Sequence, residues 1–179
     1  MRSYSAANVM EEYLETPAGF FGRMFRSFSK NGTVELEIML PRRFFLKGEL
    51  ITETIQEKAN LNFSVCDLVD LLTEELLDNY SLEPNPLKMN ETLKEISSTS
   101  IIQRYYRYSK EELISVKVKL SKRDVFKLEM MLADIAEIYD EVNYSVENIL
   151  EMQYVMFIND TIRGAKSDAI RKIIRMLNK

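Results

Sequence analysis

Val34-Glu-Leu-Glu-Ile-Met-Leu40 is the stretch of sequence that decides the fold, and Ile114-Ser-Val-Lys-Val-Lys-Leu120 repeats its pattern 80 residues later. In each stretch every second residue is a large apolar side chain, and several of these side chains are β-branched. An alternation with period two is typical of a strand that buries one face. We therefore expect two short strands of the same kind.

The sequence after each strand also repeats. A run with apolar residues at helical spacing follows both strands, and it ends at Asn62-Phe-Ser-Val65 in one copy and at Asn143-Tyr-Ser-Val146 in the other, 81 residues later. A second helical run begins there, and the serine of each motif is placed to cap it. Pro41 suits the first turn of the first helix in one copy. Ser121 is the corresponding cap in the other copy.

The chain is predicted to divide into five segments. The motif Glu83-Pro84-Asn85-Pro86 is the clearest break in the middle, and we interpret it as the hinge between two similar halves, with a helix expected from Asn90 onward. The predicted segments are an N-terminal arm (1–33), a first strand–helix–helix unit (34–80), a linker with a helix (81–113), a second strand–helix–helix unit (114–161) and a basic C-terminal helix (162–179).

One strand followed by two helices leaves a row of backbone donors and acceptors without partners. Two copies solve this problem when the strands pair antiparallel and four helices close a core over one face of the ribbon. Pairing 34–40 with itself in a second chain would oppose glutamates, whereas pairing it with 114–120 opposes glutamates to lysines, which is favourable. We expect a mainly α fold with a short two-stranded antiparallel β-ribbon, formed within one chain or by exchange between two. The alternative is that these are the solvated faces of unrelated strands.

This strand–helix–helix order, with a proline at the end of the first strand and a Ser-Val start to the second helix, resembles the ribbon-helix-helix family of Arc and MetJ type. The resemblance covers 34–80 and 114–161, and it implies a tandem ribbon-helix-helix protein in which one chain holds both copies. It also implies binding to double-stranded DNA, with the ribbon in the major groove and its outward side chains reading base edges.

The resemblance assigns base readout to the outward positions of both strands. Lysine and serine suit this role, whereas glutamate in a groove rimmed by phosphates is repelled unless it accepts a hydrogen bond from cytosine. The expected base-reading residues are Ser115, Lys117, Lys119, Glu35, Glu37 and Met39.

Phosphate contacts are expected at two kinds of place. By analogy with the family, backbone N–H groups at the start of each second helix would bind phosphate, because helix N-termini favour anions; the alternative is that the two serines only cap their helices. Arginines three apart on one helix face, with tyrosines alongside, suit phosphate or a protein interface. The candidates are Ser64, Val65, Ser145, Val146, Arg104 and Arg107.

The two ends of the chain leave alternatives open. Residues 19–30 mix four phenylalanines with three basic residues, which suits packing on the domain, a phosphate backbone or a membrane surface. The basic amphipathic run 161–179 suits a docked terminal helix, an extra DNA contact or an oligomerisation helix.

Composition excludes several function classes. The chain has no histidine and one cysteine, Cys66, so the commonest general base, the commonest zinc ligand and any intrachain disulfide are absent. Cys66 falls in the first turn of a helix, where a thiolate is favoured, but no histidine exists to activate it. The five glycines form no phosphate-binding motif. We expect no enzyme, no cofactor, no metal and no membrane span, and a cytoplasmic location.

The formal net charge is −4, so any DNA contact needs a local basic surface. We expect a sequence-specific DNA-binding regulator of transcription, such as a repressor, or an accessory factor at a plasmid or phage DNA site, acting as a homo-oligomer. The alternative is a protein-interaction adaptor or antirepressor that keeps the fold without binding DNA, which the net charge of −6 over residues 34–80 favours.

Overall fold

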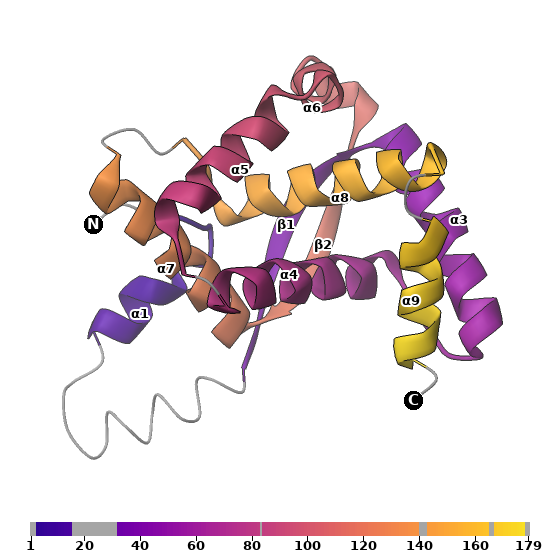
Figure 1. Cartoon of the computed structure of the whole chain (residues 1–179), viewed down its shortest axis with the longest axis horizontal. Coiled ribbons are helices and arrows are strands. Elements are labelled where there is room, and N and C mark those ends of the chain that lie inside the picture. Colours follow the sequence, from indigo (N-terminus) through magenta and orange to yellow (C-terminus); the bar gives the residue numbers. More distant parts are fainter. Residues whose placement is uncertain (1–2, 16–31, 83, 140–142, 165–166, 178–179) are drawn as a thin grey trace.

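The computed structural model describes residues 3–15, 32–82, 84–139, 143–164 and 167–177. The described part is mainly helical, with one two-stranded antiparallel sheet (Figure 1). Its elements are α1 (Val9–Glu15), β1 (Thr33–Pro41), α3 (Arg42–Ala59), α4 (Val65–Leu82), α5 (Pro86–Ser98), α6 (Ser100–Tyr105), the 3₁₀ turn η1 (Lys110–Glu112), β2 (Leu113–Ser121), α7 (Lys122–Ile138), α8 (Val146–Ile162) and α9 (Ser167–Leu177). The predicted strand–helix–helix order is therefore present twice, as β1–α3–α4 and β2–α7–α8. The interpretation of 19–30 lies outside the described residues.

The two strands pair antiparallel with each other, as the alternation and the charges predicted. Glu35 faces Lys119 and Glu37 faces Lys117, so acidic and basic side chains do oppose each other across the ribbon. In the centre of the ribbon Leu36 faces Val118. The prediction that 34–40 pairs with 114–120 is confirmed.

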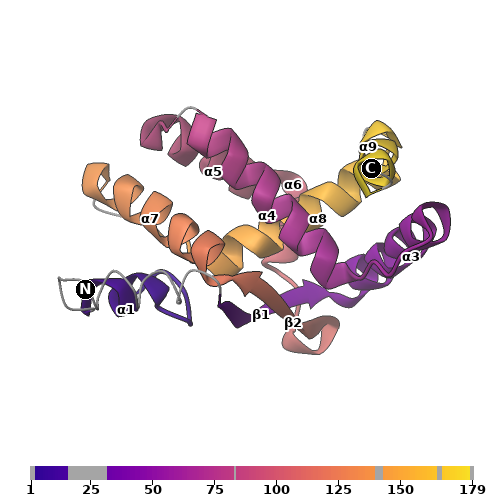
Figure 2. The ribbon, with the colours of Figure 1, turned by 90° about the horizontal axis from the view of Figure 1, so that it is seen from below.

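In the described part of the chain, helices cover one face of the ribbon and leave the other without a helix (Figure 2). The side chains on this inner face are buried in a common core with α3, α4, α7 and α8, while α8 lies along β1 and α4 along β2. The core residues that come from the ribbon are Leu36, Ile38, Leu40, Val118 and Leu120, each at most 1% exposed. The opposite face of the ribbon lies at the surface of the molecule.

The predicted helix caps are found where expected, with one shift. The Ser121 hydroxyl accepts from the N–H of Asp124 at 3.0 Å, and the Ser145 hydroxyl accepts from the N–H of Asn148 at 3.2 Å. Pro41 was expected inside the first turn of α3, but it is the last residue of β1 and the N-cap of α3, with an extended backbone. Its missing N–H still removes no helical hydrogen bond.

The segment between the two units differs from the prediction. A helix was expected from Asn90, but α5 begins at Pro86, because Asn85 caps it and proline is favoured in a first helical turn. Asn90 is itself buried. A helix was also expected to carry both Arg104 and Arg107, but α6 ends at Tyr105 and Arg107 lies in the turn beyond it.

Both ends of the described chain pack on the central core. The N-terminal segment and α1 lie against α7, where Val9 is completely buried. At the other end α9 packs on α3 through Ile173, which is 4% exposed. Of the alternatives for the C-terminal run, a docked terminal helix therefore holds for the described residues 167–177.

Candidate nucleic-acid interface

The outer face of the ribbon presents the six residues expected to read bases. Glu35, Glu37, Ser115, Lys117 and Lys119 are exposed, and Met39 is half-buried. They lie on the face that Figure 2 shows free of helices, because the pleat directs alternate residues of each strand to that side. The six residues are therefore brought together on one surface.

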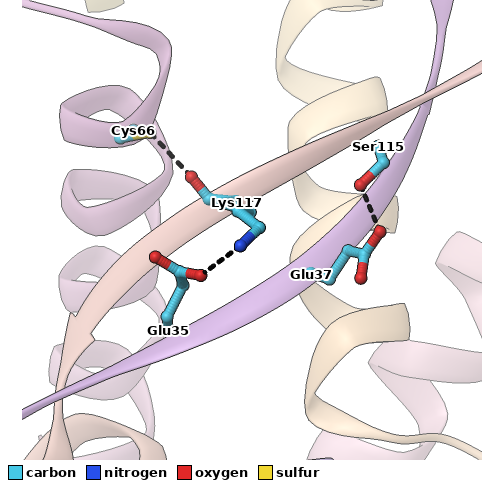
Figure 3. A network of polar contacts seen from close by, with 5 residues as sticks. All are labelled: Glu35, Glu37, Cys66, Ser115 and Lys117. Atoms are coloured by element: carbon cyan, nitrogen blue, oxygen red, sulfur yellow. Dashed lines mark hydrogen bonds and ion pairs between the residues drawn. The ribbon is translucent and has the colours of Figure 1, made fainter.

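Polar contacts join the two strands across this outer face (Figure 3). The ammonium group of Lys117 lies 2.8 Å from a carboxylate oxygen of Glu35. The hydroxyl of Ser115 donates a hydrogen bond to the carboxylate of Glu37. Each contact is diagonal, because Lys117 and Ser115 each bind the glutamate two residues along β1 from the residue that faces them. As a result Lys117 and Ser115, which were expected to contact DNA, are already bound to the glutamates of β1.

The pKa values on this face follow from the ion pair. The hydrogen bond from Lys117 and its charge lower the pKa of Glu35 below its ordinary value. The same hydrogen bond and the charge of Glu35 raise the pKa of Lys117. Both groups are charged at neutral pH. Among the described residues Lys119 makes no salt bridge, so it is the cation of the ribbon that is most available to an external anion.

The start of α4 lies directly beside β2. The Cys66 thiol donates to the backbone carbonyl of Lys117, with 3.2 Å between sulfur and oxygen (Figure 3). Burial raises the pKa of the Cys66 thiol, which opposes the thiolate that its place in a first helical turn suggested. Ser64 caps the helix by accepting from the N–H of Asp67, and the Asp67 carboxylate accepts in turn from the Ser64 N–H and hydroxyl. A phosphate near Ser64 and Val65 would therefore meet the carboxylate of Asp67.

The start of α8 is occupied by other parts of the chain. The N–H of Val146 donates to the carbonyl of Tyr4 at 2.8 Å, and the N–H of Ser145 donates to the side chain of Asn148. The carboxylate of Glu147 accepts from the N–H of Ala6 at 2.7 Å. The two N–H groups expected to bind phosphate are thus already engaged, and a phosphate could reach them only if the N-terminal segment moved.

At the outer edge of β1, the backbone N–H and C=O groups of Met39 are hydrogen-bonded by two side chains that were not expected from the sequence. The carboxylate of Glu151 accepts from the N–H of Met39 at 2.8 Å, and the hydroxyl of Tyr105 donates to the carbonyl of Met39 at 2.9 Å. Tyr105 and Glu151 also hydrogen-bond each other, with 2.7 Å between their oxygens. Burial raises the pKa of both groups. One signal was available: Glu151 lies between Leu150 and Met152 in a mostly apolar helical run, where an acid has apolar neighbours.

Arg104 and Arg107 are both exposed, near the turn that leads into β2. Tyr105 between them is 6% exposed and binds the edge of the ribbon, so it does not line a phosphate site with them. The two arginines are available to an anion, although they do not share one helix.

Other kinds of site are not found in the described part of the chain. No group of three or more Cys, Asp or Glu side chains there is arranged to hold a metal ion. Of the helices described, none is both long and apolar enough to cross a bilayer. A comparison with protein-family models, with curated proteins and with solved structures found no match to this chain.

Proposed function

We propose that this chain is a sequence-specific DNA-binding protein of ribbon-helix-helix type, with two strand–helix–helix units in one polypeptide. The observation that supports it most is the antiparallel pairing of β1 with β2, with one face packed on helices and the other without a helix among the described residues. A two-stranded ribbon of this kind fits the major groove of B-DNA. The protein would act as a regulator of transcription, or as an accessory factor at a plasmid or phage site.

Base readout in this proposal is unequal between the strands. Lys119 and Lys117 would donate to guanine acceptors, and Ser115 would accept or donate. Glu35 and Glu37 would accept from the amino group of cytosine once DNA replaces their contacts to Lys117 and Ser115. Because the two strands differ in sequence, the site would be asymmetric and not a perfect palindrome, since the symmetry of an operator mirrors that of the protein.

Phosphate contacts would come from beside the ribbon. Arg104 and Arg107 are exposed cations there, and the N-terminus of α4 lies against β2. The N-terminus of α8 would contribute only after Tyr4 is displaced from the N–H of Val146.

Binding to genomic DNA fragments across a salt series tests the proposal, with the double variant Lys117→Ala/Lys119→Ala. A matched control is Lys58→Ala/Lys88→Ala, which removes the same charge from exposed positions on α3 and α5. We expect the ribbon variant to lose sequence-specific binding, and we expect the slope of log K against log salt to fall by up to about 2 where both lysines contact phosphate. The control should bind as the native chain does. Equal weakening in both variants would mean that only overall charge matters, and the proposal would fail.

A second function is favoured by a specific observation. Lys117 neutralises Glu35, and Ser115 hydrogen-bonds to Glu37, so the polar groups of the outer face are largely occupied with each other, which suits an adaptor or antirepressor that binds protein instead of DNA. The variant Glu35→Gln/Glu37→Gln separates the two functions. For a regulator, removing both carboxylates should strengthen binding to DNA of any sequence, because repulsion from phosphate is lost and Lys117 is released, and should reduce the preference for the specific site, because the contacts to cytosine are weakened. For an adaptor the same variant should leave DNA binding absent at low salt and should weaken capture of the protein partner.

A further inference from the structure

An open groove of about 680 Å³ lies at the end of the ribbon, outside the surface proposed to bind DNA. One side is the first half of α3, and the other is the segment that leads into β2. The groove is lined by Pro41, Arg42, Arg43, Leu46, Lys47, Leu50, Tyr108, Glu111 and Glu112. No side chain in it has a role in the proposed readout of bases.

The floor of the groove is apolar and open to water. Leu46 and Leu50 lie four residues apart on α3, so they share one face of the helix. Leu46 is 51% exposed and Leu50 is 63% exposed. Single exposed leucines are common on protein surfaces, but an adjacent pair in a groove with charged rims is typical of an interface.

The two walls of the groove carry opposite charge. Arg42, Arg43 and Lys47 form the basic wall on α3, and Glu111 and Glu112 form the acidic wall. No salt bridge joins the two walls among the residues that the structure describes. Each wall is therefore open to a charged partner.

We propose that this groove binds the same groove of a second copy of the chain, and that the protein forms a two-fold dimer there. In a two-fold interface the same patch of both copies meets itself. If one residue of the first copy contacts a second residue of its partner, the reverse contact is also made. When the axis runs along the groove, rotation about it places the basic wall of each copy against the acidic wall of the other. The leucine pairs then cover each other.

The charge pattern favours a second copy over other occupants. An acidic peptide would gain from Arg42 and Arg43 but would be repelled by Glu111 and Glu112, and a basic peptide would meet the reverse problem. A partner with one acidic and one basic side around an apolar centre satisfies both walls. Another copy of this groove has that arrangement. Dimer formation here is independent of whether the ribbon binds DNA.

The test uses two charge-reversal variants of the whole chain, measured by sedimentation equilibrium. Arg42→Glu/Arg43→Glu makes both walls acidic, and acids are tolerated at the start of α3. Glu111→Arg cancels the net negative charge of the other wall and leaves Glu112, which caps η1 through Ser109, unchanged. The native chain should be dimeric at micromolar concentration. Each variant alone should dissociate with a dissociation constant raised about tenfold or more, because like charges face each other in the first variant and the attraction between the walls is lost in the second.

Mixing the two variants gives the decisive result. In the mixed pair the acidic wall Glu111–Glu112 of the first variant meets the basic wall of the second, and the other two walls no longer carry like charge, so a heterodimer should form although neither variant dimerises alone. A non-polar control compares Leu50→Ser, which should weaken the dimer, with Leu82→Ser, which changes an 85% exposed leucine outside the groove and should not. A native chain that is monomeric, a mixture that stays monomeric, or equal effects of the two leucine variants would each overturn the proposal. Far-UV circular dichroism of each variant verifies that it is folded.

Discussion

At the scale of single residues, Gly48 of α3 lies directly against the side chain of Tyr154 of α8. A Cβ atom added at Gly48 would lie 1.7 Å from the hydroxyl oxygen of Tyr154 and 2.8 Å from its Cζ. Tyr154 is completely buried and its hydroxyl donates to the carbonyl of Phe44, so its ring has no free space to move into. Glycine is therefore required at 48 for packing and not for its backbone angles.

We predict that Gly48→Ala destabilises the protein. Overpacking of this kind costs about 3 kcal/mol, from which the higher helix propensity of alanine subtracts about 1 kcal/mol. Urea unfolding of the native chain and the variant measures the difference. Tyr154→Phe removes the closest atom, so the cost of adding Gly48→Ala to it should be smaller than in the native background. A Gly48→Ala protein as stable as the native chain would show that α3 and α8 are not this close.

Glu151 shows what a single buried carboxyl group does for the ribbon. It is 6% exposed, and it accepts from Met39 and Tyr105. Burial raises its pKa above the ordinary value of 4.5. The hydrogen bonds from Met39, Tyr105 and Asn148 lower the pKa by less, and the charge of Glu147 raises it further. A raised pKa means that the folded protein binds this proton more tightly than the unfolded chain does. The contribution of Glu151 to stability is therefore fully present below pH 4.5 and is lost as the pH rises through the folded-state pKa.

We predict that Glu151→Gln removes this part of the pH dependence. The amide can still accept from the N–H of Met39 and donate to Tyr105, and it carries no buried charge. Between pH 4 and pH 7 the native chain should lose stability relative to Glu151→Gln, as measured by urea unfolding at each pH. Asp70, whose pKa is also raised by burial, remains in both proteins and cancels in the comparison.

Glu151→Ala provides the contrast for that experiment. It leaves the N–H of Met39 without its acceptor, at a cost of about 1–3 kcal/mol, so it should be less stable than Glu151→Gln at every pH. If both variants keep the native pH dependence, the titrating group is not Glu151.

At the scale of elements, the N-terminal segment depends on one side chain of α7. Glu129 is completely buried, and its carboxylate accepts from the N–H groups of Val9 and Met10 and from the hydroxyl of Ser5. These N–H groups open α1 and have no partner within that helix. A carboxylate at a helix N-terminus is favoured further by the helix dipole. A short helix of seven residues is thus held by a contact more than a hundred residues away.

We predict that Glu129→Ala releases this segment before it unfolds the rest. Each orphaned N–H group costs about 1–3 kcal/mol, so hydrogen exchange of residues 3–15 should become faster while the ribbon amides stay protected. Glu129→Gln keeps one acceptor oxygen, so its exchange rates in residues 3–15 should lie between those of the native chain and those of Glu129→Ala. Glu137→Ala on the same helix changes an exposed acid and serves as the control. Uniform loss of protection across the chain would show that the N-terminal segment is not a separate unit of opening.

The elements that could be predicted from the sequence are those fixed by local patterns. The alternation around Leu36 and Val118 predicted both strands, the Glu–Lys charges predicted their pairing, and Ser121 and Ser145 predicted two helix starts. Tertiary contacts explain what was missed. A helix was expected from Asn90 onward, but Asn90 is buried inside α5, which Asn85 caps.

The candidate site was predicted to a smaller extent. Which residues share the outer face follows from the period of a strand, so Lys117 and Lys119 are found where expected. Their partners could not be predicted from period alone, because the diagonal contact of Lys117 with Glu35 depends on the twist of the ribbon. The engagement of Val146 by Tyr4 depends on a segment with no strand or helix pattern of its own.

At the scale of the whole molecule, the core is shared between the two halves of the chain. It extends from Tyr4 to Ile173 without a break into separate clusters. The ribbon at its base takes one strand from each half, so neither half can complete the sheet alone. The break near Pro84 is therefore a boundary in the sequence but not between two independent folding units.

We predict that fragments 1–83 and 84–179 do not fold separately but form a native-like complex when mixed in equal amounts. Each fragment alone exposes the inner face of one strand, including Leu36 or Val118, and leaves its hydrogen-bonding edge without a partner. Self-pairing is disfavoured, because two copies of β1 oppose glutamates and two copies of β2 oppose lysines. Two-dimensional ¹H–¹⁵N spectra of each labelled fragment, alone and with its unlabelled counterpart, make the measurement. Well-dispersed spectra of either fragment alone would contradict the shared core. We expect dispersion to appear only on mixing, because the two strands of the ribbon are complementary in shape and in charge.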